Sequence, residues 1–199
     1  MFSKKIILAV AAVLFLGSQV LAQDLTYTLS DVAEFKISGD SNLRAWDGDV
    51  TDIEATLVLS GHNELSLENL TPESITSIDI RIAVAGIETD TARLTTNLRN
   101  YLKGDQFPHI SYRLNQVQEI ELQGDKAVIT ADGIITAAGV EKSVNMTVDA
   151  FINSDGSIRF TGTQDMLMTE FEIDPPTALL GTVRADNEFS VIFDVLFAK

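Results

Sequence analysis

The stretch Phe189-Ser190-Val191-Ile192-Phe193-Asp194-Val195-Leu196-Phe197, near the C-terminus, decides the fold class. Its apolar residues recur at every second position, with a serine and an aspartate between them. A period of two is typical of a β-strand that buries one face and exposes the other. The same alternation runs through Ile78–Val84 and Val144–Ala150, and more weakly through segments 25–29, 53–59, 110–114, 117–122, 126–136 and 158–160. The pattern therefore predicts an all-β protein.

Short turns separate these predicted strands. Gln123-Gly124-Asp125, Ala138-Gly139, Asn153–Gly156 and Ala185-Asp186-Asn187 all have the composition of tight hairpin turns. Two strands joined by so short a turn must run antiparallel. The order of strands along the chain therefore predicts an antiparallel meander.

One interval, residues 89–104, has helical rather than strand periodicity. Leu94, Leu98, Tyr101 and Leu102 are spaced so that they share one face of an α-helix. We expect Thr89 or Asp90 to cap this amphipathic helix and Gly104 to end it.

The strands fit two architectures, an open two-sheet sandwich or a closed barrel, and chain length does not choose between them. The regular burial of one face and the four prolines favour closure, because a closed barrel has no edge strand to protect. An eight-stranded barrel has room inside for side chains or for one small ligand. A binding cavity is therefore compatible with the predicted fold.

The first 22 residues have the pattern of a cleavable signal peptide. Lys4 and Lys5 precede the apolar run Ile6–Leu16, and Val20-Leu21-Ala22 supplies the small-residue ending. We expect residues 1–22 to be removed, residues 23–199 to form one domain, and the protein to be periplasmic or secreted from a bacterium. The apolar run is shorter than the roughly 20 residues that span a bilayer, so we expect no stable membrane insertion.

The charge and the missing cysteines exclude several classes of function. The 29 acidic residues outnumber the 14 basic ones, two of which leave with the signal peptide. An acidic surface repels phosphate backbones and anionic headgroups, so we expect no nucleic-acid partner and no attachment to a membrane face. Because the sequence has no cysteine, it also has no disulfides, thiolate metal sites or thiol catalysis.

The sequence contains no recognisable catalytic, cofactor or metal motif. His62 and His109 are the only histidines, and neither has a second ligand or a nucleophile at a useful spacing. The acidic segment 47–54 lacks the glycine and closing glutamate of an EF-hand, which favours a solvated loop. We therefore expect a protein that is not an enzyme and that uses no cofactor or metal.

Large, adaptable apolar residues on the predicted inner faces are the candidate site. Phenylalanine and methionine can line a cavity for a flexible chain, although a filled core would use the same residues. Arginine and lysine near one end of the barrel are candidates for holding a phosphate-bearing head group. The candidate lipid-cavity residues are Trp46, Phe107, Tyr112, Met146, Phe151, Phe160, Met166, Met168, Phe171, Phe189 and Phe193, and the head-group candidates are Arg44, Arg99 and Lys103.

Four segments together resemble the YceI-like family of secreted lipid-binding proteins. They are Ser41–Gly48 with its tryptophan, the helix exit Leu98–Ile110, the hairpin Gly133–Val144 and the phenylalanine segment Met168–Ile173, which resembles a late strand of the family. The resemblance implies an eight-stranded antiparallel lipocalin-like β-barrel with one helical insertion. It also implies an interior that accommodates a polyisoprenoid or a similar amphiphilic lipid.

Two functions remain as hypotheses. The first is a carrier or store that holds one polyisoprenoid inside the barrel. The second is a non-catalytic accessory protein with a barrel filled by its own side chains, related to stress or partnering a membrane redox protein. The sequence leaves the identity of the lipid and a possible homodimer open.

Overall fold

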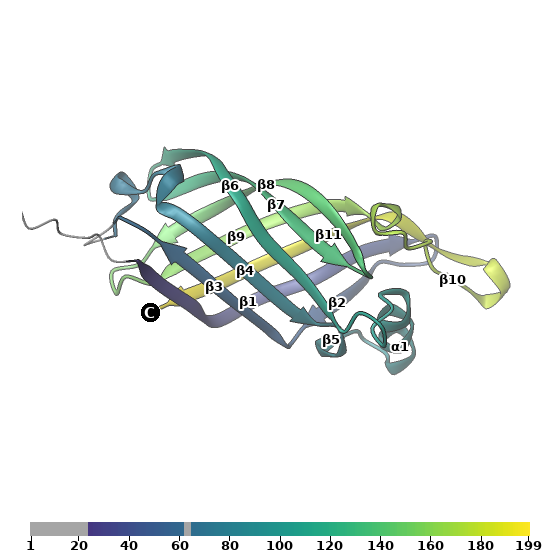
Figure 1. Cartoon of the computed structure of the whole chain (residues 1–199). Coiled ribbons are helices and arrows are strands. Elements are labelled where there is room, and N and C mark those ends of the chain that lie inside the picture. Colours follow the sequence, from purple (N-terminus) through teal and green to yellow (C-terminus); the bar gives the residue numbers. More distant parts are fainter. Residues whose placement is uncertain (1–23, 62–64) are drawn as a thin grey trace, which may run out of the picture.

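The computed structural model describes residues 24–61 and 65–199, most of which form antiparallel strands (Figure 1). The predicted signal peptide and His62 lie outside the described residues. The strands are β1 (Leu25–Ser41), β2 (Trp46–Val50), β3 (Ile53–Leu59), β4 (Ile75–Ala83), β5 (Ile87–Glu88), β6 (His109–Gln123), β7 (Lys126–Ala137), β8 (Val140–Ile152), β9 (Ile158–Leu167), β10 (Thr177–Ala178) and β11 (Val183–Ala198). The helices are α1 (Ala92–Tyr101) and the 3-10 turns η1 (Leu67–Asn69), η2 (Pro72–Ser74), η3 (Val84–Gly86), η4 (Met168–Phe171) and η5 (Leu179–Gly181).

Eight of these strands close into a barrel. Their order is β11-β9-β8-β7-β6-β4-β3-β1, and β1 pairs back onto β11 from Thr28 opposite Ala198 to Ser41 opposite Ala185. Every pairing is antiparallel, so the structure confirms the predicted barrel and excludes the sandwich. Short strands extend one end of the barrel: β2 pairs with β1, β5 with β2, and β10 with β11.

Bulges in β1 and β6 explain why the alternation of side chains predicted β6 as two strands and β1 as a shorter strand. The register of β1 against β11 shifts between Leu29 and Asp31 and again between Val32 and Glu34. In β6 the shifts lie between Leu114 and Gln116 and between Val117 and Glu119. Each bulge adds a residue and breaks the period of two. The segments predicted at 110–114 and 117–122 are therefore one strand, and the strand predicted at 25–29 continues to residue 41.

Helix α1 lies outside one end of the barrel (Figure 1) and is the only α-helix in the described part of the chain. Its N-cap is Thr91, whose side chain accepts a hydrogen bond from the Leu94 amide at 3.3 Å. The predicted caps Thr89 and Asp90 are wrong by one or two residues, because the Thr89 amide donates instead to Oγ1 of Thr95 at 2.9 Å. No helix among the described residues combines the length and the apolar character needed to cross a membrane.

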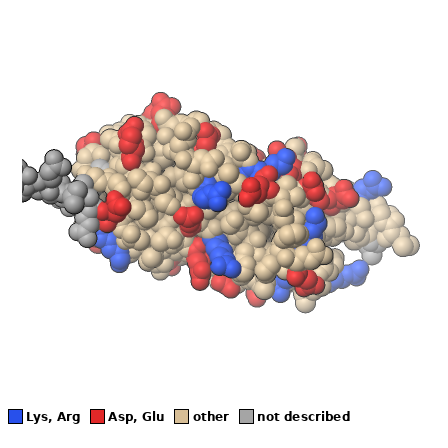
Figure 2. Space-filling model, in the orientation of Figure 1, with Lys and Arg blue, Asp and Glu red and all other residues tan. Residues whose placement is uncertain are grey.

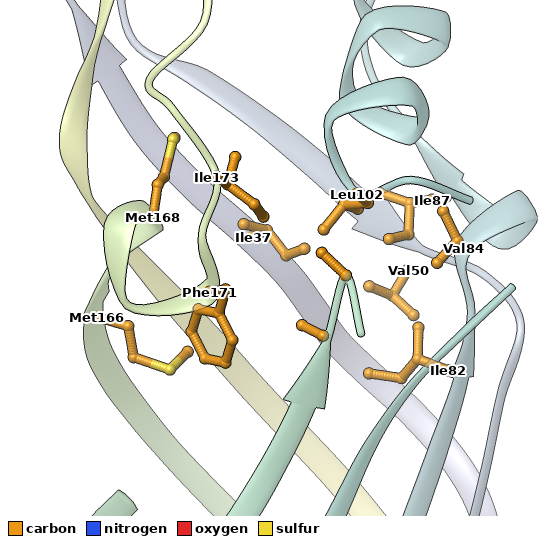
Figure 3. Close-up of a cluster of buried hydrophobic side chains, with 12 residues drawn as sticks. Ile37, Val50, Ile82, Val84, Ile87, Leu102, Met166, Met168, Phe171 and Ile173 are labelled. Carbon is orange, nitrogen blue, oxygen red and sulfur yellow. The ribbon is translucent and has the colours of Figure 1, made fainter. Parts of the chain in front are cut away.

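The segment Met168–Ile173 forms a 3-10 turn and not the strand expected from the family resemblance. Turn η4 ends at Glu172, whose φ of 54° is left-handed and reverses the chain. The reversal turns Phe171 into the barrel beside Met166 (Figure 3), and both side chains are buried. The turn therefore covers part of the barrel end that carries α1.

Two clusters of buried apolar side chains occupy the two ends of the barrel. The first, at the α1 end, contains Ile37, Leu102, Met166, Phe171 and Ile173 (Figure 3). The second, at the opposite end, contains residues of β1, β3, β4, β7, β8, β9 and β11, among them Tyr27, Leu57 and Phe197. The lumen between the two clusters is where a cavity can exist.

Candidate functional site

A hollow of about 170 Å³, here called the inner cavity, lies inside the barrel. Its walls come from every strand of the barrel, and they include Ala131, Met146 and Tyr112, none of which belongs to the two packed clusters. Met146 lies opposite Ala131 in the β7–β8 pairing, and Val117 lies opposite Ala131 in the β6–β7 pairing. Beside Ala131 the lining therefore includes residues that belong to neither cluster, whereas most of the other lining residues belong to one cluster or the other.

Small residues on the inner face of β7 create this space. Ala131, Gly133 and Ala137 share that face, and Ala131 and Ala137 line the cavity. At Gly133, a Cβ atom would lie 2.3 Å from the ring of Tyr112, so only glycine lets this ring lie flat against the barrel wall. A ring held against the wall takes less of the lumen than one that projects into it.

The polar side chains that line the inner cavity are Ser111, Tyr112 and Gln164. The side-chain amide Nε2 of Gln164 donates to the backbone carbonyl of Asp165 at 3.1 Å. Burial, with a smaller contribution from Asp132, raises the pKa of Tyr112 to about 12, so this phenol is neutral at physiological pH. No Asp, Glu, Lys, Arg or His of the described segments lines the cavity. Such a space suits hydrocarbon and penalises a charge.

A second space of about 270 Å³, here called the vestibule, lies at the α1 end of the barrel. It is enclosed by the β1–β2 turn, α1, η4 and the hairpin that leads into β11. Trp46 forms part of its wall, and its ring lies so close to Gly39 that a Cβ atom there would be 2.3 Å from Cζ2. The indole Nε1 donates to the carbonyl of Asp40 at 3.3 Å, which helps fix the ring.

The inner cavity and the vestibule meet at a constriction. Four side chains line both spaces: Ile37, Leu102, Ile173 and Phe189. Figure 3 shows the first three converging from β1, from the end of α1 and from the segment after η4. An occupant of both spaces must pass between these side chains.

The vestibule differs from the inner cavity in carrying charge. Arg44 and Arg93 line it, whereas no aspartate or glutamate of the described residues does. Arg44 pairs with Asp90 at 2.7 Å, both side chains being about half exposed. The side chain of Arg93 has no hydrogen bond or ion pair within residues 24–61 and 65–199. A free guanidinium at the mouth of an apolar cavity can bind an anion.

Most of the candidate cavity residues line one of these two spaces. Tyr112, Met146, Phe160, Met166, Phe171 and Phe193 line the inner cavity, Trp46 and Met168 line the vestibule, and Phe189 lines both. Their role in binding stays a prediction, since the structure contains no ligand.

Phe107 and Phe151 line neither space, and their predicted inward orientation is wrong. Phe107 is 38% exposed and packs over Gly139, where a Cβ atom would be 2.4 Å from the ring. Phe151 follows the inward-facing Ala150 and therefore points outward, where the guanidinium of Arg159 lies 5.9 Å from its ring centroid. Residues adjacent in a strand face opposite sides of the sheet.

Of the head-group candidates, only Arg44 lines the vestibule. Nε of Arg99 donates to the carbonyl of Ile87 at 3.0 Å, and Nζ of Lys103 donates to the carbonyl of Ala138 at 3.5 Å. Arg93 was missed by the sequence analysis. It precedes Leu94 on α1 and does not share the face of Leu94, Leu98, Tyr101 and Leu102 from which the helix was predicted.

No set of three metal-ligating side chains comes together in the described part of the chain. His109 contacts the Arg81 guanidinium at 3.1 Å on the outside of the sheet.

Comparison with known proteins connects this architecture to a family. The family model described as the YceI-like domain matches residues 27–197. No curated protein matches the chain.

Several solved structures share the fold. BcnA from Burkholderia cenocepacia has 16% identity and a TM-score of 0.59, with 83% of this chain and 96% of that chain covered. The Campylobacter jejuni YceI protein has 16% identity and a TM-score of 0.54, with 76% and 84% covered. A polyisoprenoid binding domain from Saccharophagus degradans, implicated in plant cell wall breakdown, has 9% identity and a TM-score of 0.63, with 86% and 97% covered.

The family model spans nearly all of the described barrel, and the resemblance drawn from the four sequence segments is confirmed. The chain belongs to the YceI-like domain family.

Proposed function

We propose that this protein holds one polyisoprenoid, or a similar amphiphilic lipid, as a carrier or store. The apolar chain lies in the inner cavity, and the polar end lies in the vestibule. The observation that carries the proposal is an uncharged hollow in the barrel that adjoins a vestibule lined by two arginines. The fold shared with the polyisoprenoid binding domain from Saccharophagus degradans supports the choice of lipid.

The volumes of the two spaces limit how many carbons of a lipid chain fit without movement of the surrounding side chains. A dry apolar cavity of about 150 Å³ can bind one benzene molecule. On that scale the inner cavity of 170 Å³ and the vestibule of 270 Å³ hold about six and about ten carbons. Together they accommodate about three isoprene units, and a longer chain requires the constriction side chains to move. Each buried carbon contributes about 0.8 kcal/mol to binding before the costs of ordering.

The two vestibule arginines favour an anionic head group. Arg93 has no partner among the described residues, and Arg44 is held by Asp90 on the rim. A phosphate placed between them would gain charge-assisted hydrogen bonds that an alcohol cannot match. Arg93 therefore takes the role that the sequence analysis assigned to Arg99 and Lys103.

The proposed role is binding without catalysis, in the periplasm or outside the cell. Among the described residues, the lining of the inner cavity includes no acid–base pair that could transfer a proton to or from a buried chain. The signal-peptide pattern in residues 1–22 supports export. The mass of the protein recovered from a periplasmic fraction tests the expected cleavage after Ala22.

A direct test uses native mass spectrometry of gently purified protein, which should retain a lipid of several hundred daltons. Delipidated protein should then bind geranylgeranyl phosphate, and the emission of Trp46, the only tryptophan, should report occupation of the vestibule. The neutral geranylgeraniol should bind more weakly, and Arg93→Gln should remove that difference. Equal binding of the alcohol and the phosphate would contradict the head-group assignment.

A matched pair of variants locates the bound chain. In Met146→Trp the new indole lines the inner cavity, whereas in Phe151→Trp it stands on the outer face of the same strand. Added prenyl phosphate should change the emission of the first variant by more than the response of Trp46 alone, whereas the second variant should respond as the wild type does. No response from either indole, together with no retained lipid, would overturn the proposed function and favour the accessory role with a self-filled barrel.

A further inference from the structure

Three segments surround the vestibule and form the α1 end of the molecule: residues 41–46, 91–104 and 175–185. They carry the two most exposed large apolar side chains of the described residues. Leu43 is 68% exposed and Leu180 is 109% exposed. We call these segments together the vestibule face.

The leucines of the vestibule face stand on turns that are fastened to each other. Nδ2 of Asn42 donates to the carbonyl of Thr182 at 2.9 Å, and the amide of Arg184 donates to Oδ1 of Asn42 at 2.9 Å. Leu180 lies at the tip of the second turn with a φ of 57°, a left-handed conformation that leucine rarely adopts. A strained, fully exposed leucine contributes nothing to the core, and a second exposed leucine on the adjoining turn favours an external contact for both.

The vestibule face is much less acidic than the rest of the protein. Its three segments contain five basic residues, Arg44, Arg93, Arg99, Lys103 and Arg184, and none of the 29 acidic residues of the sequence. Aspartates 40, 47, 90, 105, 174 and 186 flank the segments, and one of them, Asp90, is paired with Arg44. With these aspartates counted, the face is close to neutral, whereas the remaining surface is strongly acidic. Figure 2 shows acidic side chains along the barrel, and tan and blue surface at the far tip beyond β10.

Against the expectation drawn from the net charge of the sequence, we propose that the vestibule face docks onto a lipid bilayer that contains anionic phospholipids. Leu43 and Leu180 enter the boundary of the acyl chains, and Arg184 and Arg93 meet phosphate groups. The acidic barrel points away from the membrane, because like charges repel it. This inference rests on the proposed function, since docking in this orientation opens the vestibule onto the source of the lipid. The leucines stand on separate turns and form no contiguous packed patch, which suits a fluid interface better than a shaped protein partner.

Vesicle flotation tests the docking. Vesicles of phosphatidylethanolamine with about one third phosphatidylglycerol should carry the full-length mature protein upward at low salt, and less of it as salt rises. Leu180→Asp should weaken binding about tenfold or more, because burial of a leucine is lost. Leu180→Asn should weaken it nearly as much, although asparagine accepts the left-handed backbone better than leucine does.

The matched control is Leu122→Asp. Leu122 is 52% exposed and lies beside the β6–β7 turn, at the opposite end of the barrel from α1 (Figure 1). Its substitution by aspartate should leave flotation unchanged. Arg184→Gln should weaken flotation about fivefold, since one cation near an anionic membrane is worth about that factor.

Failure of the docking is distinguishable from failure of the proposed function. Wild-type protein that binds geranylgeranyl phosphate in solution but does not float would overturn the docking alone, as would equal losses from Leu180→Asp and Leu122→Asp. Protein that floats but retains no lipid would overturn the proposed function instead. Leu180 lines neither space, so Leu180→Asp should bind the prenyl phosphate in solution as the wild type does.

Discussion

Filling the inner cavity by Ala131→Leu should make the lipid-free protein more stable. Ala131 is 5% exposed, faces the lumen from β7, lines the inner cavity and belongs to neither packed cluster. Leucine adds three carbons at this position. If they enter empty apolar space at about 0.8 kcal/mol per carbon, the free energy of unfolding rises by about 2 kcal/mol. The same side chain occupies part of the inner cavity, where the lipid chain is proposed to lie, so the affinity for geranylgeranyl phosphate should fall.

Ala127→Leu is the matched control, on the same strand and the same face. Ala127 is 0% exposed and belongs to the packed cluster at the far end of the barrel. Overpacking there should lower the free energy of unfolding by about 1–3 kcal/mol.

Urea denaturation of delipidated protein measures the free energy of unfolding of both variants. An unchanged m-value would show that the unfolding reaction is the same. Destabilisation of Ala131→Leu to the same extent as Ala127→Leu would refute the reasoning, because it would mean that the lumen beside Ala131 is already filled.

Three further predictions follow from the site. Because the folded protein holds the pKa of Tyr112 at about 12, above the ordinary value of 10, the stabilisation from its neutral phenol is complete below pH 10. It is lost as the pH rises toward 12, so the free energy of unfolding should fall by about 2–3 kcal/mol over this range, and urea titrations of Tyr112→Phe should show little of that fall. Gly39→Ala should push the indole of Trp46 out of its position, since the new Cβ would overlap the ring, and the emission of Trp46 should then move to longer wavelength. An unchanged emission would show that the ring is not fixed by this contact. Phe151→Ala should lower the free energy of unfolding by about 1 kcal/mol or less, because the contact with Arg159 is lost. The amount of retained lipid, measured by mass spectrometry, should stay unchanged.

Local patterns in the sequence predicted the strands well where side chains alternate without interruption. The segment 189–197 lies in β11, the segment 144–150 lies in β8, and the segment 53–59 coincides with β3. The pattern failed where a bulge intervened, since in β1 the bulges hide the strand after Leu29. The strand that the family resemblance implied at Met168–Ile173 is instead the 3-10 turn η4, which ends at a left-handed Glu172. Bulges and turns of this kind depend on neighbouring strands, which a single segment does not reveal.

The residues of the candidate site were likewise predicted only in part. Inward-facing aromatic and methionine residues were identified because alternation assigns each residue to a face, and Phe151 was misassigned against that rule, since it follows the inward Ala150. Arg93 was missed because helical spacing alone does not state which basic residue lies over the barrel mouth.

The sequence by itself determined that the chain is built from amphipathic antiparallel strands with one helix, because side-chain periodicity acts through the nearest few residues. Only the tertiary structure decided that β1 closes onto β11, that the small residues of β7 face a hollow, and that Arg44 and Arg93 share a vestibule. Closure and empty volume arise from contacts between residues far apart in the chain, such as Phe35 and Phe193 or Tyr112 and Gly133. A local sequence pattern therefore cannot predict the volume that such residues leave between them.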